Sequence, residues 1–398
     1  MAFASVRDLD VKGLRVFLRA DLNVPIKEGR ITDATRIRET LPTLRALLEK
    51  GASVVLASHL GRPKGEGFEE AFSARPVAEW LKTEGFDVRL ASGVTGAAVE
   101  AEAAALKPGQ ILLLENLRFD KGETKNKPEF AEALAKLAQA YVNDAFGAAH
   151  RAHASVSGMV PHFPKDKVAA GFLMEKELTA LGRVMNHPEQ PLVVIFGGAK
   201  VSDKIELIQN FLGKAQAILI GGGMSFTFLK AQGLEIGKSL CEEDKLDLAK
   251  DLLVQAQTKG TKLMLPVDHV VAGEFKADAE AAITEDVAVP ADKMGLDIGP
   301  ETVALYAETI RGAKTLLWNG PMGVFEMQAF ASGTLSVAEE LAAAVKGGAY
   351  VLVGGGDSVA AVNQAGVAAQ MSHVSTGGGA SLEFLSGLEL PGVAALQR

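Results

Sequence analysis

The chain of 398 residues carries 41 Lys and Arg against 49 Asp and Glu, which gives a formal net charge of −8. This length predicts two or three domains, and a composition of 48% hydrophobic and 23% charged residues excludes a largely disordered chain. The negative charge argues against nonspecific nucleic-acid binding, the single Cys excludes a disulfide framework, and no segment has the pattern of a signal peptide or membrane span. We therefore expect a cytoplasmic globular protein without nucleic-acid or membrane partners.

Short runs of Val, Ile and Leu recur along the whole chain and lack the period-2 alternation of a half-exposed strand. Such runs are typical of parallel strands that are buried on both faces. They are Val16–Leu18, Val54–Ala57, Ile111–Leu114, Tyr141–Val142, Leu192–Phe196, Ala217–Ile220, Lys262–Leu265, Thr315–Trp318 and Tyr350–Val353. Helical periodicity between them is clearest at Thr35–Glu49, Arg75–Thr83, Pro128–Ala140 and Asp244–Gln257. This alternation predicts an α/β protein with doubly wound parallel sheets.

A domain boundary is expected near the middle of the chain, because so many strands do not fit one sheet comfortably. The segment Met159–Lys167 carries two prolines and is followed by a helical pattern, whose apolar positions are Met174, Leu178, Leu181 and Met185. The pattern stops before Pro188. We predict one domain over residues 1–168, a linker helix over 169–186 and a second domain over 187–384.

Charged and polar residues follow the predicted strands of the first half. They are Asp21, Asn23, His59, Arg62, Arg118, His150 and Arg151, with Arg36 at the start of the first helix. Open parallel sheets bind ligands beyond the carboxyl ends of their strands, and the planar fork of Arg matches phosphate and carboxylate. The pattern indicates a site for a small, multiply charged anion. The alternative is that these are ordinary surface arginines of loops and helix starts.

Glycines follow the predicted strands of the second half instead, at Gly197–Gly198, Gly221–Gly223, Gly354–Gly356 and Gly377–Gly379. Glycine lets the backbone approach a ligand closely, and a helix that starts there offers N–H groups to phosphate. Asp357 follows one of these runs, where a carboxylate could hold Mg²⁺ beside phosphates. The alternative is that the glycines serve tight turns and close packing.

Lys200 and Lys204 are predicted to share one face of a helix that begins after the first glycine pair. A bound polyphosphate would turn the repulsion between the two ammonium groups into a favourable interaction. The alternative is a solvated charged face on which nearby acidic residues soften the repulsion.

Nine stretches, in order along the chain, carry a resemblance to a known family. They are RADLNVP at 19–25, HLGRPKG at 59–65, ENLRFDKGET at 115–124, HRAHA at 150–154, GGAKVSDKI at 197–205, LDIGP at 296–300, WNGPMGVFE at 318–326, GGGDS at 354–358 and STGGGASL at 375–382. Together they resemble phosphoglycerate kinase, and the match runs nearly from end to end.

The resemblance implies reversible phosphoryl transfer between 1,3-bisphosphoglycerate and ADP, which gives 3-phosphoglycerate and ATP in glycolysis. It implies two Rossmann-like domains with a cleft between them, joined by a hinge helix whose bending closes the cleft. The N-terminal domain would bind the phosphoglycerate and the C-terminal domain the Mg²⁺-nucleotide. A final segment at about 385–398 would pack back on the first domain, and the protein would be a monomer.

The same resemblance assigns roles to individual residues by motif. The residues expected to bind the triose are Asp21, Asn23, Arg36, His59, Arg62, Arg118, His150 and Arg151. Those expected at the nucleotide are Lys200, Gly222, Gly223, Gly295, Leu296, Asn319, Glu326, Gly355, Gly356, Asp357 and Ser358, with Asp357 as the Mg²⁺ ligand. Those expected at the transferring phosphoryl group are Arg36, Lys204, Gly378 and Gly379.

Other functions remain to be weighed against this one. A nicotinamide-dependent dehydrogenase would require G-x-G-x-x-G, which the sequence lacks. A two-domain anion-binding protein without catalysis would explain the arginines but not the glycine-rich half with Asp357. A catalytically inactive relative would keep both ligand sites. A binding experiment separates the first three functions. The kinase would bind ATP with Mg²⁺, the dehydrogenase would bind NAD, and the anion-binding protein would bind neither.

Overall fold

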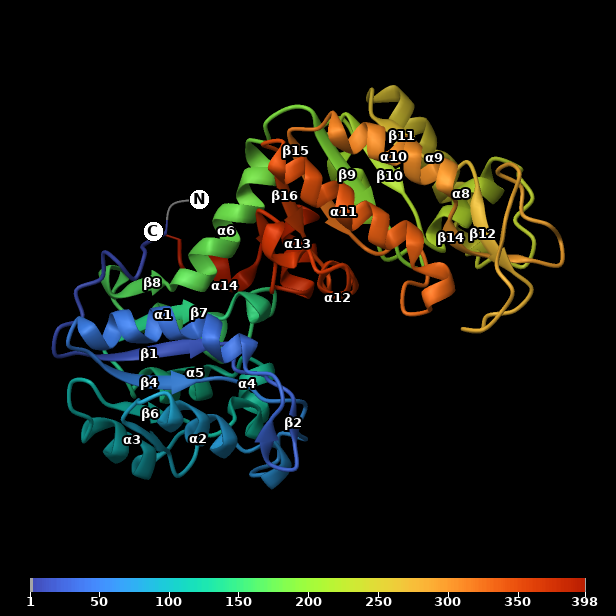
Figure 1. The fold of residues 1–398 in the computed structure, drawn as a ribbon. Coiled ribbons are helices and arrows are strands. Elements are labelled where there is room, and N and C mark those ends of the chain that lie inside the picture. The colour runs from blue at the N-terminus through green and yellow to red at the C-terminus, as the bar shows by residue number, and fades with distance from the viewer. Residues whose placement is uncertain (1–2, 398) are drawn as a thin grey trace. The chain divides into compact units, whose positions relative to one another are not determined.

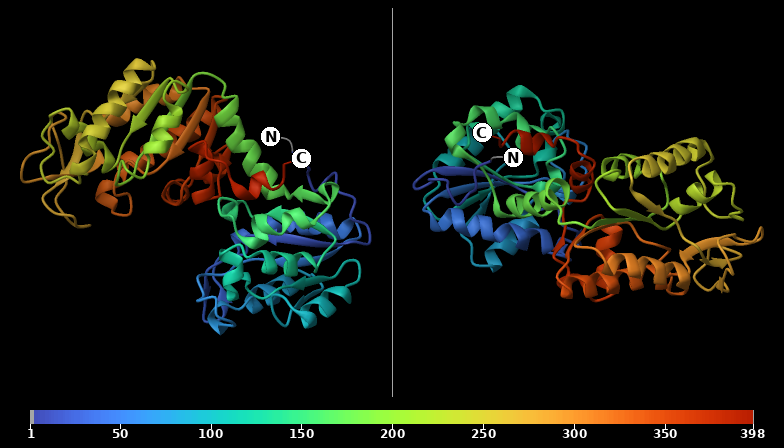
Figure 2. Two further views of the ribbon diagram at one scale, coloured as in Figure 1. Left: turned by 180° about the vertical axis from the view of Figure 1, so that it is seen from behind. Right: turned by 90° about the horizontal axis from the view of Figure 1, so that it is seen from above.

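The computed structural model describes residues 3–397, so Met1, Ala2 and Arg398, which fall within the expected segments 1–168 and 385–398, lie outside the described residues. The chain divides into two compact units. Unit 1 comprises Met1–Leu178 and Glu389–Arg398, and unit 2 comprises Thr179–Leu388. Each unit contains a six-stranded sheet flanked by helices (Figures 1 and 2). The predicted fold class, α/β with two doubly wound parallel sheets, is confirmed.

The sheet of unit 1 has the strand order β5-β6-β4-β1-β7-β8, and every neighbouring pair is parallel. Its strands are β1 (Arg15–Ala20), β4 (Ser53–Ala57), β5 (Val88–Leu90), β6 (Ile111–Leu113), β7 (Ala140–Asp144) and β8 (Val168–Ala170). A short hairpin, β2 (Ile26–Lys27) with β3 (Arg30–Ile31), follows β1. The helices are α1 (Thr35–Glu49), α2 (Arg75–Thr83), α3 (Ala97–Ala104), α4 (Lys121–Thr124), α5 (Pro128–Ala135) and α14 (Pro391–Ala394).

Alternate residues of the strands in unit 1 pack on opposite faces of the sheet. Val16 and Leu18 belong to a core that also holds the buried apolar residues of α1 and α2. Phe17 lies between them in the strand and points the other way, where its ring stacks on Tyr141 at 6.1 Å. Tyr141 in turn contacts Phe163 with ring centroids 5.8 Å apart. Both faces are therefore apolar, which explains the continuous apolar runs in the sequence.

The sheet of unit 2 has the order β11-β10-β9-β15-β16-β17 and is also parallel throughout. Its strands are β9 (Leu192–Phe196), β10 (Ala217–Ile220), β11 (Lys262–Met264), β15 (Thr315–Asn319), β16 (Tyr350–Val353) and β17 (His373–Val374). The helices are α7 (Ile205–Phe211), α8 (Met224–Ala231), α9 (Leu246–Thr258), α10 (Pro300–Arg311), α11 (Ser332–Lys346), α12 (Gly356–Gln364) and α13 (Gly379–Leu385).

Helices cover both faces of this sheet as well. Figure 1 shows α10 and α11 side by side, and their buried residues form one core with Ile195 and Trp318 of the sheet. Phe196 points to the opposite face, where its ring lies 6.2 Å from that of Phe211 in α7. Because helices cover the two faces, the carboxyl ends of the strands are followed by loops. Open parallel sheets bind their ligands at this edge.

A three-stranded antiparallel sheet in unit 2 is absent from the sequence prediction. It consists of β12 (His269–Ala272), β13 (Ala282–Ile283) and β14 (Met294–Ile298), with β12 in the middle. The short exposed strand β13 and a glycine inside β14 leave little apolar periodicity to detect. This sheet contributes a wall of the pocket described below.

Two predicted helices have different limits in the structure. The helix expected over Pro128–Ala140 ends at Ala135, because the chain must turn there to enter β7 at Ala140. The helix expected over Asp244–Gln257 begins as a 3-10 turn at Glu243–Lys245 and continues as α9.

Two segments link the units along the chain. Helix α6 (Phe172–Asn186) contains the point at which unit 1 ends and unit 2 begins. The chain returns to unit 1 at Glu389, and the N–H of Gly392 in α14 donates to the carbonyl of Ala149 at 2.8 Å. Among residues 3–397, no helix is both long enough and apolar enough to cross a membrane.

Candidate active site

The carboxyl ends of four neighbouring strands in unit 1 lead into polar loops. The strands β6, β4, β1 and β7 are adjacent and parallel, so their ends lie along one edge of the sheet. The side chains that follow them are, in this strand order, Arg118, His59, Asp21 with Asn23, and His150 with Arg151. We call these residues, together with Arg36 and Arg62, the basic cluster.

Arg36 connects α1 to the loop after β1. Its Nη1 lies 3.2 Å from Oδ2 of Asp21 and donates to the carbonyl of Asn23 at 3.3 Å. The Oδ1 atom of Asn23 accepts a hydrogen bond of 2.8 Å from the N–H of Gly61, in the loop after β4. Because the Arg36 side chain is 43% exposed, its ion pair contributes little to stability, and the guanidinium remains accessible to an anion.

Arg118 is the most buried arginine of this cluster. Its Nη1 donates to the carbonyl of Gly61 at 2.8 Å, and its backbone N–H donates to Oδ1 of Asn116 at 3.1 Å. Burial lowers the pKa of Arg118, and the positive charges of Arg19, Arg151 and Arg62 lower it further. The cluster is therefore a site of concentrated positive charge that an anionic ligand would relieve.

Two histidines among these arginines are held in the neutral form. Burial first, and then the charges of Arg19, Arg118 and Arg36, lower the pKa of His59 well below its usual value. Burial and the neighbouring arginines lower the pKa of His153 to about 4. At neutral pH both rings are therefore uncharged, and each carries one N–H donor and one acceptor nitrogen.

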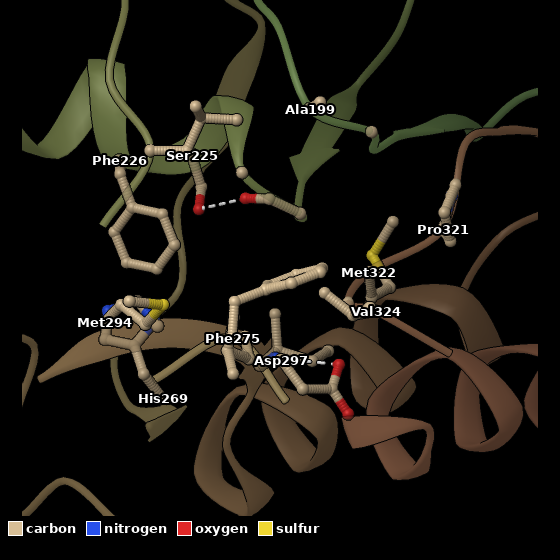
Figure 3. Close-up of a pocket in the computed structure, with 18 of the residues that line it drawn as sticks. Ala199, Ser225, Phe226, His269, Phe275, Met294, Asp297, Pro321, Met322 and Val324 are labelled. Carbon is tan, nitrogen blue, oxygen red and sulfur yellow. Dashed lines mark hydrogen bonds between the residues drawn. The ribbon is translucent and has the colours of Figure 1, made fainter. Parts of the chain in front are cut away.

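Unit 2 contains a pocket of about 520 Å³ at the carboxyl ends of its strands (Figure 3). Of the residues predicted to bind nucleotide, six line it: Gly222, Gly223, Gly295, Leu296, Glu326 and Asp357. Its other walls are largely apolar side chains, among them Phe226, Phe275, Met294, Met322 and Val324. An apolar slot whose lining also includes charged side chains, among them Lys238, Glu326 and Asp357, fits a flat heterocycle that carries polar groups.

The glycines around this pocket serve two different purposes. A Cβ at Gly222 would meet Gly198 N at 2.6 Å, and one at Gly197 would meet the carbonyl of Pro321 at 2.0 Å, so these positions allow backbones to pack together. No heavy atom lies within 4 Å of a Cβ placed at Gly198 or Gly356, so the backbone there faces open space. The packing alternative thus explains the first pair, whereas the second pair leaves backbone available to a ligand.

Lys204 and Lys200 do not share a helix face, contrary to the prediction. Helix α7 begins only at Ile205, with Lys204 as its N-cap and Lys200 exposed in the preceding loop. The Nζ of Lys204 donates to Oδ1 of Asn319, at the end of β15. Burial lowers the pKa of Lys204, and the charges of Asp203 and Asp357 partly oppose this effect. A half-buried ammonium group close to Asp357 is suited to a phosphate ligand.

Helix starts and polar side chains join the glycine loops of unit 2. Asn319 donates from Nδ2 to the carbonyl of Gly354 at 2.8 Å, and Ser358 accepts from the N–H of Gly320 at 2.6 Å. Helix α12 begins at Gly356, after Gly355 at a φ of +90°. The other residues predicted to bind nucleotide do not line the pocket itself: they are Lys200, Asn319, Gly355, Gly356 and Ser358. They lie in the loops and helix starts beside it.

Gly378 and Gly379 are exposed at the start of α13, and Gly378 has a φ of +52°. The preceding N–H, that of Gly377, donates to Oγ of Ser375 at 3.2 Å. A Cβ at Gly378 would meet no heavy atom within 4 Å. The backbone at this helix start is therefore accessible.

The comparisons with known proteins agree with this arrangement. The family model described as phosphoglycerate kinase matches residues 6–388. The chain belongs to the phosphoglycerate kinase family. A phosphoglycerate kinase of Moorella thermoacetica is 56% identical over 397 residues, with 100% of this chain and 99% of the relative covered. One of Chloroflexus aurantiacus is 54% identical over 397 residues and covers 99% of this chain and 98% of the relative.

Solved structures give the same result. The phosphoglycerate kinase of Coxiella burnetii has a TM-score of 0.91 with 44% identity, covering 99% of each chain. That of Pyrococcus horikoshii has a TM-score of 0.80 with 32% identity, covering 99% of this chain and 98% of the other. The resemblance stated from nine motifs is confirmed for the whole chain.

Phosphoglycerate kinases act on nucleotides, and the resemblance implies Mg²⁺ bound with them. Among residues 3–397, no group of three or more His, Cys, Asp or Glu side chains is placed to hold a metal ion. Asp357 is a single exposed carboxylate on the first turn of α12 and lines the pocket. One carboxylate fits Mg²⁺, which commonly keeps several waters and takes its other ligands from substrate phosphates. A dedicated protein cage for the ion is neither needed nor present in the described part.

Several residues at the two sites of this phosphoglycerate kinase fold were not predicted from the sequence. Glu123 and Ser155 are buried beneath the basic cluster, and Arg19 was noted only as part of a motif. His269 lines the pocket from β12, and its ring lies tilted against that of Phe226 with the centroids 4.9 Å apart. The motifs contain Arg19 and Glu123, but neither the motifs nor the periodicity could show a role for any of these residues, because each acquires its place through packing between distant segments. The motif WNGPMGVFE did contain the pocket residues at 321–324.

Proposed function

We propose that this chain is a phosphoglycerate kinase enzyme that reversibly transfers a phosphoryl group between 1,3-bisphosphoglycerate and ADP, giving 3-phosphoglycerate and ATP. One observation carries the proposal, namely that both units have a site at their strand ends: a cluster of arginines in unit 1, and in unit 2 a largely apolar pocket lined in part by glycines and Asp357. The chain belongs to the phosphoglycerate kinase family, and this family identifies the reaction for which two such sites are used.

The basic cluster would bind the three-carbon substrate. Asp21, Asn23, Arg36, His59, Arg62, Arg118, His150 and Arg151 supply charged and neutral donors along one sheet edge. Bidentate and charge-assisted hydrogen bonds from arginine suit a ligand with both a phosphate and a carboxylate. The neutral state of His59 supports a role as a hydrogen-bond partner and not as a proton carrier.

The pocket of unit 2 would bind ATP or ADP. Gly222, Gly223, Gly295 and Leu296 would contact the base, and Glu326 the sugar. Lys200, Asn319, Gly355, Gly356 and Ser358 would lie along the phosphates. Asp357 would hold Mg²⁺, which when bound neutralises negative charge on the nucleotide phosphates.

The chemistry requires little from the protein beyond placement and charge. The acceptor for transfer from ATP is a carboxylate, which is already ionised at neutral pH, so no general base is needed. Arg36, Lys204 and the N–H groups at Gly378 and Gly379 would stabilise the negative charge of the moving phosphoryl group. Burial of Lys204 supports this role, because a partly desolvated cation interacts more strongly with a phosphate.

The two sites belong to different units, so we propose that bending near helix α6 brings the substrates together, with unit 1 as the phosphoglycerate domain and unit 2 as the nucleotide domain. Exclusion of water would then prevent hydrolysis of the transferred group. We also propose a cytoplasmic monomer without nucleic-acid or membrane partners.

The test is formation of ADP from ATP by the purified protein, measured with 3-phosphoglycerate and Mg²⁺ while the acyl phosphate is removed. We expect activity that disappears when 3-phosphoglycerate is omitted. Binding of both ligands without turnover would show an inactive relative and contradict the proposal. Failure to bind either ligand would contradict the assignment of both sites.

A further inference from the structure

A buried carboxylate lies beneath the basic cluster and has no role in the function proposed above. Glu123 in α4 is fully buried, and its two oxygens accept from one residue. Oε1 accepts from Oγ of Ser155 at 2.6 Å, and Oε2 accepts from the N–H of Ser155 at 2.9 Å. Ser155 itself is fully buried in the single-turn π-helix Ala154–Gly158. Burying an ionised carboxylate is costly unless its hydrogen bonds are made, and here they fix one serine.

The hydroxyl of Ser155 has only one proton, and the carboxylate of Glu123 uses it. The lone pairs of the same oxygen are therefore left to accept, and Nε of Arg19 donates to it at 2.8 Å. Arg19 is 1% exposed, so its orientation depends on these protein contacts. Its Nη1 donates to the carbonyl of Ala20. The guanidinium is thereby fixed at two of its three nitrogens.

The third nitrogen, Nη2 of Arg19, lies 3.3 Å from Nδ1 of His59. A guanidinium has N–H donors and no acceptor, so Nδ1 of His59 must be the acceptor of this contact. The ring is neutral at physiological pH, because burial and the surrounding arginines lower its pKa. A neutral ring that accepts at Nδ1 carries its single proton on Nε2. Nε2 is thus the donor that the ring can offer to a ligand.

We propose that Glu123 is a positioning residue that, through Ser155 and Arg19, fixes the Nε2–H tautomer and the orientation of His59 for the substrate. The proposal rests on the assignment of His59 to phosphoglycerate binding, but the tautomer is a property of the free protein. The chain of contacts joins four segments: α4, the π-helix, β1 and the loop after β4. Glu123 does not touch the substrate in this account and acts on His59 through the two intervening side chains. Its charge also raises the pKa of Arg118, and its Oε1 lies 3.8 Å from Nδ1 of His153.

The chain offers a matched control at Glu115. This carboxylate is also buried, and it accepts from Oγ of Ser73 at 2.8 Å and from the N–H of Ala74 at 2.9 Å. It thus makes the same pair of contacts, a serine hydroxyl and a backbone N–H, and Oε2 also accepts from the N–H of Asn116 at 3.3 Å. None of these three contacts is to an arginine side chain. Glu115→Gln therefore measures the cost of neutralising a buried carboxylate that makes no hydrogen bond to Ser155, Arg19 or His59.

The first measurement is ¹⁵N NMR of the histidine rings in the free, full-length protein, with the His59 signals assigned by their absence in His59→Gln. We expect wild-type His59 to be the Nε2–H tautomer and to remain neutral between about pH 6 and 8. An Nδ1–H tautomer, or a ring that becomes charged in this range, overturns the proposal without any further variant. This result is independent of catalysis, so it separates the proposal from the assignment of the kinase reaction.

The second measurement compares Glu123→Gln and Ser155→Ala with Glu115→Gln. We expect the first two variants to shift the ring signals of His59 and to raise the KM for 3-phosphoglycerate about tenfold, with the KM for ATP unchanged within twofold. Glu115→Gln should leave the His59 signals and both KM values unchanged, even if it unfolds more easily. Unaltered His59 signals in both Glu123→Gln and Ser155→Ala, or an equal effect of Glu115→Gln, would overturn the proposal.

Discussion

The two units use the same sheet edge in opposite ways. In unit 1 the strand ends present charged side chains, and buried contacts such as the hydrogen bond between Arg19 and Ser155 orient them. In unit 2 the strand ends present glycine backbone, and the apolar side chains around it form a pocket. A small substrate with charge at both ends requires many directed donors. A nucleotide offers a flat base and a phosphate chain, which a slot and a few N–H groups can hold.

Lys204 is the clearest exception to this difference between the units, because it is a charged side chain in the site of unit 2, which otherwise consists largely of glycine backbone and apolar side chains. We expect Lys204→Ala to lower kcat by about 10³-fold, as loss of a cation that stabilises the transferring group does, with nucleotide affinity changed only a few-fold. Steady-state kinetics and nucleotide titration measure both quantities. Lys214→Ala, at an exposed position three residues after the end of α7, is the control. A loss of less than tenfold would remove Lys204 from the transfer step.

Substitution of Asp297 measures how a buried carboxylate near the pocket of unit 2 affects the unfolding free energy. Burial raises its pKa to about 7, although its oxygens accept from the N–H groups of Gly333 and Ile298. Because the folded pKa lies above the unfolded one, the folded state binds the proton more tightly. Asp297 therefore stabilises the fold below about pH 4, and this contribution is lost as the pH rises through about 7, by roughly 4 kcal/mol in total.

Asp297→Asn should remove that part of the pH dependence. Denaturant unfolding between pH 4 and 7.5 measures it as the difference between the two proteins. The slope of the unfolding free energy against pH should be less negative in the variant. Parallel curves would show that Asp297 does not titrate in this range.

Gly222 and Gly356 separate the two purposes of the glycines in unit 2. At Gly222 the φ is +67° and backbone atoms lie within 2.6 Å of an added Cβ, so Gly222→Ala should cost about 2–4 kcal/mol in unfolding free energy. Gly356→Ala adds a Cβ to open space at a helix start and should change stability by less than about 0.5 kcal/mol. Thermal or urea unfolding compares them. Equal costs would refute the distinction.

Arg62 represents the charged side chains that form the site of unit 1. Because it is exposed, its substitution does not disturb the packing. Arg62→Ala should weaken 3-phosphoglycerate binding by about 1.5–3 kcal/mol, the value of one hydrogen bond to a charged group, and leave ATP affinity unchanged. Isothermal titration measures both. Arg89→Ala, an exposed arginine in β5 that contacts Gln110, serves as the control. Unchanged phosphoglycerate affinity in Arg62→Ala would contradict its assignment.

Asp357 should show the smallest effect, because one carboxylate is only part of the ligand set for Mg²⁺. We expect Asp357→Asn to raise the Mg²⁺ concentration for half-maximal activity about tenfold, with partial recovery at high Mg²⁺. A Mg²⁺ titration of the kinase rate measures this shift. A superimposable titration curve would exclude Asp357 as a ligand.

The sequence indicated most of the sheet edge but not what supports it. Parallel strands buried on both faces produce apolar runs, so the positions of Asp21, His59 and Arg118 after those runs could be predicted. Glu123 and Ser155 could not, because 32 residues separate them and only tertiary packing brings them together. Sequence motifs therefore located the charged groups, whereas the hydrogen-bond network that orients them required the structure.

In unit 2 the glycine runs were visible, but their two purposes were not. Whether a glycine packs against another backbone or faces open space depends on loops that are distant in sequence, as Gly222 and Gly198 show. The helix predicted to carry Lys200 and Lys204 begins later, because the loop after β9 first continues beside the loops after β10 and β15. The antiparallel sheet that holds His269 escaped prediction because its strands are short and partly exposed.

The return of the chain to unit 1 at Glu389 has a consequence for biosynthesis. Gly392 packs so closely on Ala149 that an added Cβ would lie 2.9 Å from its Cα, and Val393 and Leu396 are buried. During translation this surface of unit 1 therefore stays uncovered until the whole of unit 2 has been made. Unit 2, which is continuous in sequence, can complete its own packing first. The part of the protein whose synthesis begins first is thus the part that finishes folding last.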